Sequence, residues 1–156
     1  MKKIIVVLLV VMSFGCSIYD VTMDAVYISK IKKAEIYYHE DFKALHSLDD
    51  IHTYLNTHID YKQDTWDTWS TTEEILTRGY GDCEDFAIAF MNIYFVVFGE
   101  KLDFILVDLS RTVVKGGWID HALIISSNGN SLSPQSGEIN QSYEICFKYN
   151  FDLFFY

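Results

Sequence analysis

The segment from Cys83 to about Phe98 constrains the fold most, because its residues are apolar on nearly every side of a helix. A helix that is apolar all round is buried, so this segment predicts a central helix inside a core. Gly99 follows where the glycine of a helix C-terminus is expected. With 156 residues, of which 50% are hydrophobic and one is proline, the chain has room for one packed domain.

From Lys101 onward the helical period gives way to short runs rich in Ile, Val, Leu and Phe. These runs predict strands over 102–109, 118–126 and 145–156, and the Asn128–Gly129 pair after the second is typical of a hairpin. Helices followed by antiparallel strands indicate an α+β domain, with the central helix packed on an antiparallel sheet.

A shorter helix is predicted over residues 48–58. Ser47, followed three residues later by Asp50, resembles a capping box with a shorter arm. Apolar residues then recur at intervals of four from Ile51, which is typical of an amphipathic helix.

The N-terminus is typical of an export signal: two lysines precede nine unbroken apolar residues, from Ile4 to Met12. Nine residues cannot span a bilayer, which needs about 20. Gly15 directly before Cys16 resembles the lipobox of bacterial lipoproteins, which implies that Cys16 is lipidated and becomes the mature N-terminus. An ordinary signal peptide is the alternative.

We therefore expect residues 1–15 to be removed, residues 16–46 to form a tether and an N-terminal helix, and residues 47–156 to form a monomeric domain. Removal of the signal takes away two lysines and no acidic residue, so the formal charge falls from −10 to −12. Such an acidic chain is not expected to bind nucleic acid or anionic headgroups. Attachment of the exported protein to a bacterial membrane would come from acyl chains on Cys16.

Cys83 stands in the first turn of the predicted central helix, shortly after two glycines. The unpaired backbone N–H groups and the dipole of a helix N-terminus stabilise a thiolate and can also bind an oxyanion. Three neighbouring acids, Asp82, Glu84 and Asp85, oppose ionisation of the thiol unless a cation compensates.

His121 lies 38 residues after Cys83, at the start of the apolar run Ala122–Ile125. A histidine that opens a core strand can face the helix N-terminus and act as general base and ion-pair partner of the thiol. A disulfide between Cys83 and Cys146 remains an alternative for an exported chain, although Cys146 is expected at a buried strand position.

The residues that carry chemistry form a recognisable order: Asp67-x-Trp69, Glu73-Glu74, Arg78-Gly-Tyr-Gly-Asp-Cys83-Glu-Asp-Phe-Ala87 and His121-Ala-Leu123. This order resembles the bacterial transglutaminase-like cysteine peptidases over about residues 47–135. The resemblance implies a papain-like α+β fold, Cys83 as the nucleophile, His121 as the general base, and acyl transfer through a thioester. It also implies that Trp69 walls the substrate cleft, with a plain core position as the alternative.

The third catalytic residue of that family is an aspartate on the strand after the histidine, and Ser133 stands at this position here. Serine can accept the imidazole N–H but cannot stabilise imidazolium by charge. Gln135, Asp120 or a displaced carboxylate remain as alternatives.

Some members of the family bind calcium through the acids that flank the nucleophile, which correspond to Asp82, Glu84 and Asp85. The alternative is that these residues cap the helix and complement its dipole, and no cofactor is then required.

These observations lead us to expect thiol-dependent acyl transfer in the cell envelope, in the form of hydrolysis of a peptide or amide bond in a protein or peptide substrate. The alternative is a catalytically weak or inactive lipoprotein of the same fold that binds a protein or glycan partner.

Overall fold

The computed structural model describes residues 25–26, 28–63, 69–108, 120–125, 131–134, 139–140 and 145–156. For residues 106–108, 120–125, 131, 139–140 and 145–147 it describes the backbone alone. The expected signal segment 1–15, Cys16 and the Asn128–Gly129 turn lie outside these ranges. The chain divides into two compact units, residues 1–31 and 32–156, and in the first unit residues 25–26 and 28–30 are helical.

The second unit combines helices with an antiparallel sheet, which confirms the predicted α+β class. Its helices are η1 (Glu40–Ala44), α3 (Leu48–His58), α4 (Thr72–Arg78), α5 (Cys83–Phe98) and η2 (Phe151–Leu153). Its strands are β1 (Asp60–Tyr61), β2 (Tyr80–Gly81), β3 (Asp103–Asp108), β4 (Asp120–Ile125), β5 (Ser131–Leu132), β6 (Ile139–Asn140) and β7 (Ile145–Tyr149).

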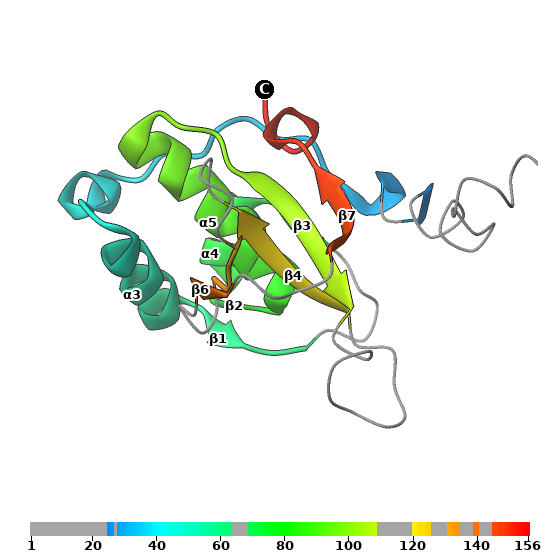
Figure 1. Ribbon diagram of the computed structural model, residues 1–156. Helices are drawn as coiled ribbons and strands as arrows, with labels where there is room; N and C mark the ends of the chain where they lie inside the picture. Colours follow the sequence, from blue (N-terminus) through cyan, green and yellow to red (C-terminus); the bar gives the residue numbers. More distant parts are fainter. Residues whose placement is uncertain are drawn as a thin grey trace, which may run out of the picture. The chain divides into compact units, whose positions relative to one another are not determined.

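The main sheet is antiparallel and has the strand order β6-β5-β4-β3-β7. In Figure 1, α5 lies behind β3 and β4, and it packs against both strands. Helices α3 and α4 pack against α5 in turn. Strands β1 and β2 form a separate parallel pair. This arrangement places α5 in the core, between the main sheet and the other helices.

Helix α5 confirms the prediction made from its apolar sequence. It spans Cys83–Phe98, and every residue from Cys83 to Ile93 is buried. It ends at Gly99, whose φ of 73° lies in the left-handed region that glycine adopts without strain. The backbone N–H of Gly99 donates to the carbonyl of Phe95 and closes the last turn.

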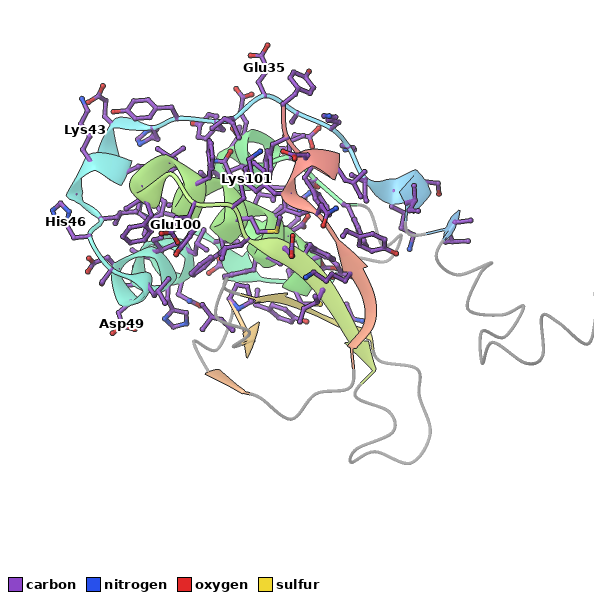
Figure 2. The ribbon with its side chains drawn as sticks, turned by 45° about the horizontal axis from the view of Figure 1, so that its top comes forward. Glu35, Lys43, His46, Asp49, Glu100 and Lys101 are labelled. Carbon is purple, nitrogen blue, oxygen red and sulfur yellow. The ribbon has the colours of Figure 1, made fainter. Side chains whose placement is uncertain are left out.

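Helix α3 was also predicted correctly. The side chain of Ser47 accepts a hydrogen bond from the backbone N–H of Asp50, as in a capping box. The Asp50 carboxylate accepts from the N–H of His46, one residue before the cap. In Figure 2, Lys43, His46 and Asp49 project away from the segment that leads from η1 into α3.

The compact unit begins earlier than the expected boundary at residue 47. Asn92, fully buried in α5, clamps the backbone of Tyr37: its side-chain oxygen accepts from the Tyr37 N–H at 2.9 Å, and its side-chain nitrogen donates to the Tyr37 carbonyl at 2.7 Å. Ala34 pairs with Phe155 in a parallel bridge. Residues 32–46 are therefore part of the domain, because these contacts join them to α5 in the core and to the segment around Phe155.

The last predicted strand, 145–156, is shorter than expected. Strand β7 ends at Tyr149, and the chain turns into η2. The turn directs aromatic side chains into the core, where Phe151 lies 5.0 Å from Phe95 and Phe154 lies 5.1 Å from Phe104, measured between ring centroids. Among the described residues, no helix is long and apolar enough to cross a membrane.

We predict that Asn92→Ala destabilises the domain by about 2–4 kcal/mol, because it leaves the N–H and the carbonyl of Tyr37 without partners in a part-buried position. Denaturant unfolding measures the change. Asn56→Ala is the matched control, since Asn56 is exposed and its side chain bonds only within α3, so we expect less than about 0.5 kcal/mol. Equal effects of the two substitutions would contradict the clamp.

Candidate functional site

Cys83 is the first residue of α5, and its side chain is 8% exposed. The sulfur belongs to a thiol and not to a disulfide, so the structure does not contain the Cys83–Cys146 bridge considered as an alternative. The backbone of Cys146 lies in β7, as expected. The structure thus gives Cys83 the position that the sequence predicted, at the start of a buried helix.

Glu84 is the nearest acid to the thiol. The Cys83 thiol donates to Oε2 of Glu84 across 2.9 Å, and the Glu84 side chain is as buried as Cys83. Burial raises the pKa of Glu84 from 4.5 to about 8, and the negative charge of Asp82 adds to this effect. Glu84 therefore holds a proton at neutral pH, and the thiol faces less negative charge than a count of acidic residues suggests.

The Asp85 carboxylate accepts hydrogen bonds from two separate parts of the chain. Its Oδ1 accepts from the backbone N–H of Ser70 at 3.0 Å, and its Oδ2 accepts from Nη2 of Arg78. Burial raises the pKa of Asp85 to about 6, against the opposing influence of Arg78, so the pair is ionised at neutral pH.

Arg78 completes this network from the end of α4. Its Nη1 donates to Oγ of Ser70 at 2.8 Å, and its Nε donates to the carbonyl of Tyr80 at 2.6 Å. One guanidinium thus holds three points of the chain: the start of α5, the segment before α4, and β2. Arg78 is a positioning residue. It was included in the motif before Cys83 but was assigned no function from the sequence.

The hydrogen bonds of Asp85 require a residue without a side chain at position 81. A Cβ built on Gly81 would lie 2.7 Å from Cβ of Asp85 and 2.9 Å from its Oδ2. Any larger residue would push the carboxylate away from Arg78. The glycine before Cys83 therefore serves the close approach of Asp85.

The helix caps expected from these acids are not formed. Asp82 occupies the N-cap position, but its side chain makes no capping hydrogen bond. The Asp85 carboxylate, three residues further on, accepts from Ser70 and Arg78 instead.

The three acids do not share one cation-binding point, since the Asp85 carboxylate is engaged by Arg78 and Ser70 while Glu84 accepts from the Cys83 thiol. Across the described ranges, no group of three or more His, Cys, Asp or Glu side chains is arranged to hold a metal ion. This arrangement does not fit the calcium site that the resemblance implies.

His121 lies in β4, where its backbone pairs with Val107 of β3, and Asp120 opens the same strand. Strand β4 packs against α5, the helix that begins with Cys83. Ser133 is 6% exposed and follows β5, the neighbour of β4 on its other side. Gln135 lies outside the described residues.

Trp69 is 1% exposed and lies in the core. Its ring centroid is 5.1 Å from that of Phe104 and 6.2 Å from that of Phe154. This is the position of a core tryptophan, the alternative to a cleft wall.

Tyr61 is a residue of the site that the sequence did not single out. It lies in β1, opposite Gly81, and its side chain is 49% exposed although Cys83 nearby is buried. Partial burial raises the pKa of Tyr61, and the charges of Cys83, Asp82 and Glu84 raise it further. Its ring centroid lies 6.4 Å from that of Phe86. The sequence signal was weak, since only pairing in space brings residues 61 and 81 together.

Comparison with models of known protein families and with curated protein sequences gives no match. The fold and the site define the chain as an α+β domain with a thiol at the N-terminus of its central helix. A thiol in this position can act as a nucleophile, and the residues around it can hold or release its proton.

We predict that the stability of the domain falls as the pH rises from 4.5 to about 8, because Glu84 binds its proton more tightly in the folded state than in the unfolded chain. The stabilisation that the protonated Glu84 contributes is fully present below pH 4.5, and it is lost as the pH rises through about 8. Glu84→Gln stays neutral, so we expect a flatter profile and a variant more stable than the parent at pH 9. Denaturant unfolding at pH 5, 7 and 9 measures this.

The matched control is Glu73→Gln, because Glu73 is exposed in the first turn of α4. Its profile should run parallel to that of the parent protein. If Glu84→Gln also ran parallel, Glu84 would not carry the proton.

Proposed function

We propose that the protein is a thiol hydrolase of the transglutaminase-like kind, with a papain-like core, that cleaves a peptide or amide bond. The observation that carries the proposal is the thiol of Cys83 in the first turn of α5, with His121 in the strand that packs on this helix. Export and a lipid anchor at Cys16 belong to the same proposal and place the activity in the cell envelope.

In the proposed reaction His121 takes the proton of the Cys83 thiol, and the thiolate attacks the carbonyl carbon of the substrate. A carbon–sulfur bond forms, and the amine leaves with the proton that His121 returns. Water then attacks the thioester and regenerates the thiol. The backbone N–H groups in the first turn of α5 offer hydrogen bonds to the oxyanion of each intermediate.

The electrostatics of the cluster place less negative charge around the thiol than the three neighbouring acids indicate. Glu84, with a pKa of about 8, is mostly protonated there and adds little negative charge beside the sulfur. The charge of Asp85 is matched by Arg78. The helix N-terminus therefore acts on the thiol with less opposition than the sequence indicated.

A second candidate function is favoured by Ser133, which stands where the family has an aspartate. A serine cannot stabilise an imidazolium by charge. In this case the domain would bind a protein or glycan partner with little or no turnover.

The rate of Cys83 alkylation by iodoacetamide against pH tests the proposal on the full chain in mild detergent. We expect fast alkylation at pH 6–7, and a loss of about tenfold or more in His121→Ala, because the thiolate loses its imidazolium partner. His52→Ala is the control, since His52 lies in α3, away from the proposed pair. Slow alkylation that does not depend on His121 would favour the binding protein.

We predict that millimolar calcium leaves both the melting temperature and the alkylation rate unchanged, since both oxygens of Asp85 already accept hydrogen bonds and its charge is matched by Arg78. A rise in melting temperature with calcium that disappears in Asp82→Asn would contradict this prediction and restore the calcium site.

A further inference from the structure

Tyr61 is fixed beside the start of α5 by backbone pairing. The N–H of Asp60 donates to the carbonyl of Gly79 at 2.9 Å, and the N–H of Lys62 donates to the carbonyl of Gly81 at 2.8 Å. These two bonds hold β1 against β2, two residues before Cys83 (Figure 1). The backbone of Tyr61 is thus tied by hydrogen bonds to the segment that leads into Cys83.

The side chain of Tyr61 packs against Phe86 and is also partly exposed to solvent. Its ring is tilted at 45° to that of Phe86, one turn into α5 from Cys83. This ring contact and the pairing of Tyr61 with Gly81 place the side chain at the N-terminal end of α5, the end that carries Cys83. About half of Tyr61 remains exposed, so the residue is accessible to a molecule in solution.

The phenol also has the chemistry of an oxyanion donor. Burial and the neighbouring negative charges raise the pKa of this phenol from its ordinary value of 10, so its O–H is protonated at neutral pH. A neutral O–H donor near a nucleophile stabilises negative charge that develops on a carbonyl oxygen.

We propose that Tyr61 is a catalytic residue that donates its phenol O–H to the carbonyl oxygen of the substrate as Cys83 attacks. The inference rests on the proposed function of Cys83. In the step, the thiolate forms a bond to the carbonyl carbon, the π electrons move to the oxygen, and Tyr61 and the N–H groups of α5 hold the resulting oxyanion. Return of these electrons expels the leaving group.

Two reagents separate this role from the reactivity of the thiol. Acetylation of Cys83 by p-nitrophenyl acetate passes through an oxyanion and releases p-nitrophenolate. Alkylation by iodoacetamide displaces iodide directly and forms no oxyanion. Tyr61→Phe removes only the hydroxyl and keeps the ring on Phe86, and Tyr80→Phe is the matched control, an exposed tyrosine on the adjacent strand.

On the full chain in mild detergent, we expect Tyr61→Phe to slow acetylation by about 10- to 100-fold, with alkylation within about twofold of the parent protein. Tyr80→Phe should leave both rates unchanged. Unfolding curves of each variant check that the fold is intact.

Acetylation in Tyr61→Phe at the parent rate would overturn the inference and leave the proposed function standing. An equal loss of both rates would overturn it too, because Tyr61 would then act through the thiol. A parent protein in which Cys83 is neither acetylated nor alkylated would overturn the inference and the proposed function together.

Discussion

The ion pair between Arg78 and Asp85 is the constraint on which the start of α5 depends. Asp85 is inaccessible to solvent and accepts hydrogen bonds from Ser70 and Arg78, while Gly81 leaves room for its approach. Removal of one partner from a buried pair leaves an uncompensated charge and costs about 3–5 kcal/mol. The contacts of Arg78 with Asp85 and Tyr80 therefore fix the segment that precedes α5, and with it the position of Cys83.

The acids around Cys83 divide into two kinds, which a charge count on the sequence does not distinguish. Asp85 is ionised and matched by Arg78, whereas Glu84 is buried close to the charge of Asp82 and holds its proton up to about pH 8. Protonation removes the charge that burial would otherwise penalise. A nucleophile can thus stand among three acids without facing three negative charges.

The sequence predicted the elements whose signals are local. The unbroken apolar face of 83–98 and the cap at Ser47 identify α5 and α3 without knowledge of the rest. Helix α4 was missed, although Thr71 and Glu74 form a full capping box and could have been recognised. The attachment of residues 32–46 depends on partners up to 121 positions away in the chain, as in the pairing of Ala34 with Phe155, and Tyr61 likewise depends on strand pairing with Gly81. No periodicity encodes such contacts. The partners of Arg78 lie within eight positions of it, but they follow no helical or strand spacing either.

That bridge also brings the two ends of the domain together. The N–H of Ala34 donates to the carbonyl of Phe154 at 2.8 Å, and the N–H of Tyr156 donates to the carbonyl of Ala34 at 3.2 Å. Figure 2 shows Glu100 and Lys101 in the exposed connection between α5 and β3, well inside the sequence. The domain is thus suited to circular permutation: a short linker can join its ends, and new ends can open at this connection, with the thiol segment left continuous.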